Sequence, residues 1–304
     1  MVVVHNFSDG LLTPVLAYAI SCLGCFLGLR CTTRARAVQG ASRVRWLLLA
    51  ALSIGVAGVW TMHFVAMLGY SIPGETIRYN VPVTILSMLI SVVVVAVGLL
   101  IVGFGGEGLR PLLTGGLIIG IGVACMHYIG MSAMRMPYSM HYNAGLVALS
   151  VVIAVVTGTV ALLAALRLDT VWSAFGACLI MGAAISGMHY TGMAALRIDE
   201  PAAGGMAAMV GGASAGAFLV PLICGVTILT MTLTSAISLS PTQEELRKEN
   251  EFIESIASSY GGQRVPEVTN HYAELFPGKS GSRAPASFAG YDCQEEKQRW
   301  SRVA

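Results

Sequence analysis

Charged side chains are scarce along most of this sequence. Lys, Arg, Asp and Glu make up 11% of its 304 residues, hydrophobic residues make up 55%, and the mean hydropathy is +0.73. Before residue 240 the chain carries only 10 of its 18 basic and 6 of its 16 acidic residues. Soluble globular domains carry about 25% charged residues. The sequence therefore predicts an integral membrane protein with a polar tail.

Three further absences narrow the class of protein. The sequence has no basic run with interleaved aromatic residues, so it predicts no nucleic-acid partner. It shows no phosphate loop, kinase signature or constellation of catalytic side chains, so it predicts no enzyme. The first hydrophobic run lacks a basic n-region and an Ala-x-Ala site, so a cleaved signal peptide is not expected.

The seven cysteines form no disulfide framework. They occupy positions 22, 25, 31, 125, 178, 224 and 293. Most of them lie inside hydrophobic runs, where cysteine behaves as a small hydrophobic residue. Cys22 and Cys25 share a helix face, but zinc would need two further ligands beside them. The sequence favours packing over zinc at this pair.

Seven stretches are hydrophobic and long enough to cross a bilayer, which takes about 20 helical residues. They cover residues 11–29, 46–69, 81–103, 112–134, 145–166, 171–195 and 215–239. The sequence thus predicts an all-α polytopic membrane protein, with seven transmembrane helices arranged as three tandem helix-pair repeats plus a final helix. The bilayer itself is its first expected partner.

The distribution of arginine predicts the orientation, because Lys and Arg in short loops are retained on the cytoplasmic side. The first, third and fifth loops hold seven arginines, whereas the second, fourth and sixth hold three. The sequence therefore predicts a multi-pass protein of the cell membrane, with an extracytoplasmic N-terminus and a cytoplasmic C-terminus.

One six-residue motif occurs three times inside the hydrophobic stretches. It reads Met-His-Phe-Val-Ala-Met at 62–67, Met-His-Tyr-Ile-Gly-Met at 126–131 and Met-His-Tyr-Thr-Gly-Met at 188–193. The histidines are 64 and 62 residues apart, the period of one helical hairpin. At 1.5 Å per helical residue, all three are expected about 10 Å below the outer surface. Histidine is costly in lipid, so three in register indicate a shared site.

Each copy presents a histidine and its second methionine on one helix face, because residues four apart are neighbours there. The pairs are His63 with Met67, His127 with Met131, and His189 with Met193. Imidazole suits copper, zinc and iron, whereas thioether sulfur selects copper, above all Cu(I). These residues predict a copper-like metal site.

Other interpretations of the repeat stay open. The histidines would serve without metal as helix-packing residues, as proton carriers, or as haem ligands in a membrane redox protein. A transporter of metal or protons is a further class, although neither broken helices nor carboxylates inside the hydrophobic stretches support it.

The sequence Met-His-Tyr-Thr at 188–191, and the array as a whole, resemble the MHYT domain family of bacterial integral membrane sensors. The resemblance covers about residues 5–240. It implies copper held near the outer membrane face and detection of oxygen, carbon monoxide or nitric oxide. Carried over to this sequence, it implies as ligands Met62, His63, Met126, His127, Met188 and His189, with Met67, Met131 and Met193 as downstream partners.

Two features depart from the family pattern. Phe64-Val65 and Tyr128-Ile129 stand in place of Tyr-Thr in the first two copies. Relatives often continue into a cyclic di-GMP synthase or phosphodiesterase domain, whereas residues 241–304 are few and polar. We expect those residues to form a cytoplasmic tail, a short helix followed by disorder. The signal is then expected to pass through the last hydrophobic helix to an unknown cytoplasmic partner.

Overall fold

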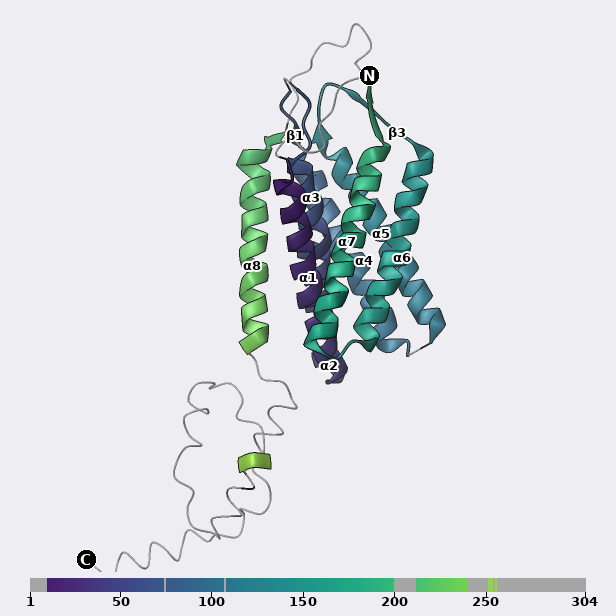
Figure 1. Cartoon of the computed structure of the whole chain (residues 1–304), viewed down its shortest axis with the longest axis vertical. Coiled ribbons are helices and arrows are strands. Elements are labelled where there is room, and N and C mark those ends of the chain that lie inside the picture. Colours follow the sequence, from purple (N-terminus) through teal and green to yellow (C-terminus); the bar gives the residue numbers. More distant parts are fainter. Residues whose placement is uncertain are drawn as a thin grey trace, which may run out of the picture. The chain divides into compact units, whose positions relative to one another are not determined.

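The protein consists mainly of long hydrophobic helices that run alongside one another (Figure 1). The computed structural model describes residues 10–73, 75–106, 108–199, 212–239, 251–253 and 255. Its longer helices are, in chain order, α1 (Leu12–Arg36), α2 (Gly40–Leu52), the π-helix η1 (Ser53–Thr61), α3 (Met62–Leu68), α4 (Val81–Phe104), α5 (Leu109–Ser132), α6 (Ala144–Arg167), α7 (Val171–Ala195), the π-helix η2 (Ala215–Leu219) and α8 (Val220–Leu239).

Six helical rods in the described ranges are long and apolar enough to cross a membrane. They are α1, the continuous rod of α2, η1 and α3 (Gly40–Leu68), α4, α5, α6 and α7. The first six predicted spans are thereby confirmed. The predicted seventh, at 215–239, falls on η2 and α8, whose described apolar stretch, Ala215–Val226, is shorter than a span. A count of seven is not confirmed.

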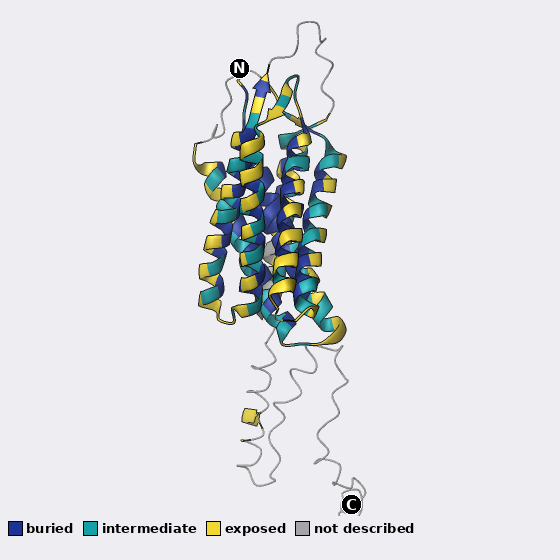
Figure 2. Cartoon of the chain, turned by 90° about the vertical axis from the view of Figure 1, so that its right-hand side faces the viewer, coloured by how far each residue is buried: buried dark blue, intermediate teal, exposed yellow. Residues whose placement is uncertain are grey.

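The six rods pack as a closed ring. α4 packs on α5, α5 on α6, α6 on α7 and α7 on α1, while the rod of α2, η1 and α3 lies between α1 and α4. This rod is the most buried of the six, since 83% of its hydrophobic window is buried against 22% for α6. Buried residues face the middle of the ring and exposed ones face outward, as a lipid-facing surface requires (Figure 2).

Glycines set the closest contacts between helices. A Cβ on Gly24 would lie 2.3 Å from the nitrogen of Gly58, so α1 and η1 meet backbone to backbone. A Cβ on Gly120 would lie 2.3 Å from the Cα of Val155, so α5 and α6 meet in the same way. Small residues permit such approach in lipid, where no hydrophobic driving force joins helices.

The first motif copy follows a π-helix. The wider turns of η1 shift its backbone hydrogen bonds, and two buried serines from neighbouring helices donate to its carbonyls. Ser21 of α1 donates to Gly58 O at 2.7 Å, and Ser91 of α4 donates to Gly55 O at 2.8 Å. η1 ends directly before Met62, where the motif begins.

Short antiparallel strands lie at one end of the ring, called the strand end below. β1 (Arg78–Tyr79) pairs with β2 (Met134–Arg135) and β5 (Ala213–Ser214), and β3 (Ser139–Tyr142) pairs with β4 (Leu196–Asp199). β1 comes after α3, β2 after α5 and β4 after α7, so all three motif helices run toward this end (Figure 1).

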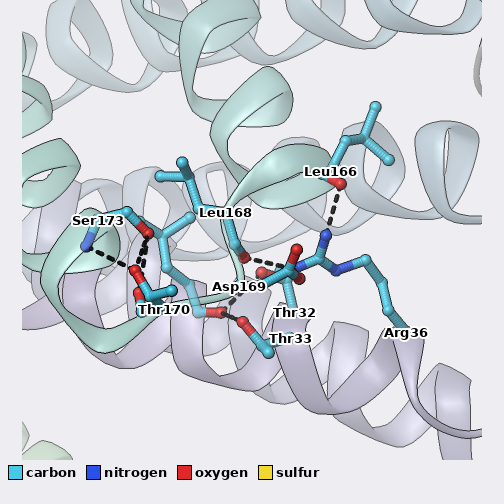
Figure 3. A network of polar contacts seen from close by, with 9 residues as sticks. Thr32, Thr33, Arg36, Leu166, Leu168, Asp169, Thr170 and Ser173 are labelled. Carbon is cyan, nitrogen blue, oxygen red and sulfur yellow. Dashed lines mark hydrogen bonds and ion pairs between the residues drawn. The ribbon is translucent and has the colours of Figure 1, made fainter.

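At the opposite end, Arg36 joins the last turn of α1 to the loop between α6 and α7. Its guanidinium donates to the carbonyls of Leu166 and Leu168 and lies 2.7 Å from the carboxylate of Asp169 (Figure 3). The side chain of Thr170 then caps α7 by accepting a hydrogen bond from Ser173 N.

The predicted tail lies almost entirely outside the described residues. Of residues 241–304, the structure describes 251–253 and 255, which are helical. The predicted disorder and the boundary at residue 240 therefore stay predictions.

Candidate metal centre

The repeat places its three histidines at one level of the ring. His63 stands in α3, His127 in α5 and His189 in α7, each five or six residues before its helix ends near the strands. Each histidine and the methionine four residues later lie in the same α-helix, where residues four apart share a face.

The three imidazoles converge through their Nδ1 atoms. His63 Nδ1 lies 3.0 Å from His189 Nδ1 and 3.1 Å from His127 Nδ1, and one ligand atom from each of the three lies within 4.8 Å of the others. The ring centroids are 4.8 to 5.1 Å apart, with interplanar angles of 75° to 90°. The rings therefore stand edge to face around a common centre.

The histidine triad, defined as His63, His127 and His189, is shut away from solvent. Its members are 1%, 0% and 1% exposed. The other buried polar groups of the described residues belong to serines, threonines, tyrosines and Trp60, with no carboxylate among them. The triad is thus a set of neutral nitrogen donors without an anionic partner in that core.

Hydrogen bonding alone leaves this arrangement unsatisfied. A neutral imidazole Nδ1 carries either one proton or one lone pair, so it makes one good hydrogen bond. His63 Nδ1 faces two other Nδ1 atoms at hydrogen-bonding distance. The two contacts must therefore share either the one proton or the one lone pair of His63 Nδ1, whereas a single cation would bind the lone pairs of all three Nδ1 atoms when their protons are on Nε2.

The spacing fits a transition metal. Bonds of about 2.0–2.1 Å from nitrogen to zinc place two tetrahedral ligands about 3.3 Å apart, close to the observed 3.0 and 3.1 Å. Within the described ranges the triad is the one cluster of three His, Cys, Asp or Glu side chains that could hold a metal ion. Zinc at Cys22 and Cys25 gains no support.

Two glycines that we did not single out from the sequence shape the site. A Cβ on Gly130 would lie 2.5 Å from His63 Nε2, and a Cβ on Gly192 would lie 2.3 Å from His127 Nε2. The ring of one copy therefore rests against the glycine of the next. Both glycines stand three residues after a motif histidine, and the first copy has Ala66 there. A small residue three positions after each motif histidine was therefore the sequence signal that could have identified these glycines.

The aromatic residue of each copy packs edge-on against its own histidine. The centroid distances are 4.7 Å for Phe64, 4.9 Å for Tyr128 and 5.0 Å for Tyr190. Tyr128 also shares a 2.7 Å hydrogen bond with Ser150. A ring is needed here for packing, which accounts for phenylalanine in the first copy.

All six motif methionines belong to the buried core. They are between 0% and 5% exposed: Met62, Met67, Met126, Met131, Met188 and Met193. What the structure assembles as a donor set is the three imidazoles. Ligation by methionine stays a prediction.

The strand end covers the triad. Tyr79 of β1 packs on Phe64 at 6.2 Å between centroids, and Phe64 packs on His63. Tyr79 is 2% exposed, and burial raises the pKa of its phenol above the ordinary value. The fourth histidine of the described residues, His141 of β3, lies outside the triad. Its side chain is exposed, and its Nε2 lies 4.0 Å from a carboxylate oxygen of Asp199.

Known proteins with similar sequences point to bacterial signalling. The MHYT family, described as the bacterial signalling protein N-terminal repeat, matches residues 57–115 and 120–178. These two matches include the first two motif copies, and the copy at 188–193 lies beyond them. No solved structure matches the chain significantly.

Three curated relatives carry signalling names. The bifunctional diguanylate cyclase/cyclic di-GMP phosphodiesterase MucR of Pseudomonas aeruginosa is 33% identical over 233 residues, 75% of this chain and 33% of MucR. The cyclic di-GMP phosphodiesterase NbdA of the same organism is 37% identical over 62% of this chain and 24% of NbdA. The signaling protein YkoW of Bacillus subtilis is 30% identical over 59% of this chain and 23% of YkoW.

These relatives correct the prediction that the protein is not an enzyme. MucR and NbdA are named as cyclic di-GMP enzymes, and the chain spans about a third of the first and a quarter of the second. The matches cover the MHYT-like region, so enzymatic activity is not shown for this chain. Lack of a catalytic constellation in a sensory region was no ground for excluding an enzyme. Residues 57–115 and 120–178 of this chain are two repeats that match the MHYT family of bacterial signalling proteins.

Proposed function

We propose that this protein is a multi-pass sensor of the bacterial cell membrane whose histidine triad binds a copper-like metal to detect oxygen, carbon monoxide or nitric oxide. The observation that carries this proposal is the convergence of three buried Nδ1 atoms at 3.0 and 3.1 Å. The sensor would comprise residues 5–240, and residues 241–304 would lie on the output side.

The surroundings favour a soft cation of low charge. Burying charge in an apolar core is costly, and the described core offers no carboxylate to balance it. A monovalent ion costs less than a divalent one, and Cu(I) accepts imidazole and thioether ligands. Met67, Met131 and Met193 are the proposed sulfur partners, with Met62, Met126 and Met188 beside the histidines.

A bound copper ion would supply a coordination position for a small neutral ligand. The chain's own part is to hold the three imidazoles edge to face, to seat two of them against Gly130 and Gly192, and to exclude water beneath Phe64 and Tyr79. Imidazole ligands that are already in position and shielded from water suit the reversible binding of an uncharged gas by the metal.

Two alternatives predict different geometry or behaviour. Haem at this site conflicts with the structure, because ring centroids 4.8 to 5.1 Å apart leave no slot for a macrocycle. A transporter of metal or protons would move its cargo across vesicles. Flux that stops in His127→Ala would favour transport over sensing.

The strand end is proposed to face the outside, with the C-terminus in the cytoplasm, because arginines concentrate in the loops of the opposite end. Gas or metal binding would bias the arrangement of the three motif helices. α8 is the proposed route for this bias, since it contacts η1.

The proposed output is cyclic di-GMP turnover, by analogy with the named activities of MucR and NbdA. A downstream cyclase or phosphodiesterase, on this polypeptide or on a partner, would carry it out. Cellular cyclic di-GMP is expected to change on copper addition with the intact triad and not with the triad replaced. Equal responses from both would overturn the coupling.

The first test is metal content. Purified protein in lipid nanodiscs, loaded with Cu(I), is expected to hold near-stoichiometric copper by elemental analysis. The triple variant His63→Ala, His127→Ala, His189→Ala should hold almost none, and the milder His127→Gln should bind more weakly.

His141→Ala is the matched control, because it removes an exposed histidine outside the triad. It should keep its copper. A folded protein that takes up no metal, or a triple variant that retains it, would indicate that the motif serves helix packing and not metal binding.

A further inference from the structure

A cavity lies in the middle of the ring, on the side of the triad away from the strand end. Its volume is about 40 Å³, and side chains from η1, α4, α5, α6 and α7 line it. One water-sized sphere needs about 10–15 Å³ on the same scale. The cavity is therefore large enough for one small guest molecule.

The cavity begins one helical turn from the triad. Val59, Val123 and Ile185 line it, and each precedes a motif histidine by four residues. Met188, which adjoins His189, lines it as well. A guest in this space would have only one layer of side chains between it and the imidazoles.

The walls suit an apolar guest. Thr157 is the one lining residue with a polar side chain, and its hydroxyl donates to the carbonyl of Ile153 at 2.7 Å. A water molecule there would find one side-chain acceptor, the Thr157 hydroxyl, which is fewer than the two to four polar partners that a buried water needs. Apolar cavities of this kind stay dry and accept xenon or small apolar molecules.

A guest that reaches this cavity would come from the lipid. The triad is at most 1% exposed, and buried Tyr79 and Met134 belong to strands at the end above it. The outward faces of the surrounding helices carry exposed aliphatic side chains, among them Val152 and Ile180. Diatomic gases dissolve readily in hydrocarbon, so the bilayer delivers them where water delivers little.

We propose that this cavity is a binding site for one apolar diatomic gas molecule, which enters from the bilayer and is held one helical turn from the triad. Oxygen, carbon monoxide and nitric oxide share this chemistry. Detection of the bound gas by a metal at the triad rests on the proposed function above. Occupancy of the cavity does not depend on it.

Xenon is the probe, because it is apolar, inert toward metals and similar in size to these gases. In protein labelled with 13C at isoleucine methyl groups, Ile119 and Ile185 line the cavity and Ile180 faces outward. Raising xenon pressure is expected to shift the first two signals saturably, and to change Ile180 only linearly with pressure.

A filling variant and its control complete the test. Ala154→Leu extends a cavity-lining residue into the space and should abolish the saturable shift, whereas Val152→Leu on the outer face of α6 should keep it. Ala161→Leu replaces the first variant if that fails to fold. A saturable shift that survives filling, or none in the unaltered protein, overturns the proposal.

Metal content of the same samples separates the two proposals. Copper-loaded protein without a saturable xenon shift overturns the gas site and leaves the metal centre. Metal-free protein that shows the shift upholds the gas site and removes the copper function.

Discussion

At the scale of single residues, the absence of one methyl group decides where the histidine rings lie. The ring of His127 occupies the space that a side chain on Gly192 would fill, and His63 does the same at Gly130. Metal affinity depends strongly on how ligating histidines are oriented by their surroundings. These glycines therefore position the site, although they donate no atom to a metal.

Gly192→Ala tests this role. The added Cβ would lie 2.3 Å from His127 Nε2, so the imidazole must turn away from its partners. We expect copper affinity to fall about 10- to 100-fold, the range typical when support of a ligating histidine is lost. Competition with a copper chelator of known affinity measures it.

Gly187→Ala is the matched control on the same helix, because a Cβ there meets nothing within 4 Å. Its copper affinity should stay at the level of the unaltered protein. Equal affinities for both variants would show that Gly192 does not position the ring.

At the scale of elements, the π-helix η1 makes the first motif copy unlike the other two. α5 and α7 carry their histidines on uninterrupted α-helices, whereas α3 begins where η1 ends. The nine residues of η1 are all buried, and its carbonyls at Gly55 and Gly58 accept hydrogen bonds from other helices. Its geometry is thus held by its neighbours.

Ser21→Ala and Ser91→Ala test that dependence. Each removes the hydroxyl that satisfies a buried carbonyl, which costs about 1–3 kcal/mol of the free energy of unfolding. The decrease should appear in reversible unfolding by sodium dodecyl sulfate in mixed micelles. The double variant should also bind copper more weakly, because η1 leads directly into His63.

Thr114→Ala gives the baseline. This exposed hydroxyl donates within its own helix, to Arg110 O, and its loss should change stability by no more than about 0.5 kcal/mol. Serine variants as stable as this one would mean that η1 holds its geometry unaided.

The limits of sequence-based prediction are clearest at this scale. Hydrophobic runs predicted the first six spans because burial in lipid is a local requirement. The strands escaped prediction, since β1 and β2 are two residues long and pair across 57 positions, Arg78 with Arg135. Such a pairing leaves no periodic trace in either segment. The π-helix likewise depends on donors from other helices.

At the scale of the whole molecule, the ring is closed at its two ends by different means. Strands join the ends of the motif helices above the triad, and a charged clamp joins α1 to the α6–α7 loop at the other end. In the clamp, Arg36 is largely covered, with 25% of its side chain exposed, whereas Asp169 is 75% exposed. The two partners should therefore contribute unequally.

Arg36→Gln should lower the free energy of unfolding by about 1.5–3 kcal/mol, because two carbonyls lose a charged donor. Asp169→Asn should cost no more than about 1 kcal/mol, the value of an exposed ion pair. Detergent unfolding of both variants measures the difference. A larger loss from Asp169→Asn would mean that the ion pair, and not the carbonyl contacts, holds the loop.

The sequence by itself determined that this is a helical membrane protein with a threefold histidine motif, and that the histidines share one level, because hydrophobicity and period are local properties of a chain. Only the tertiary structure decided that the Nδ1 atoms meet, that glycines from neighbouring copies seat the rings, and that an apolar cavity lies one turn away. Those features depend on how six helices pack, and helix packing joins residues that are far apart along the chain.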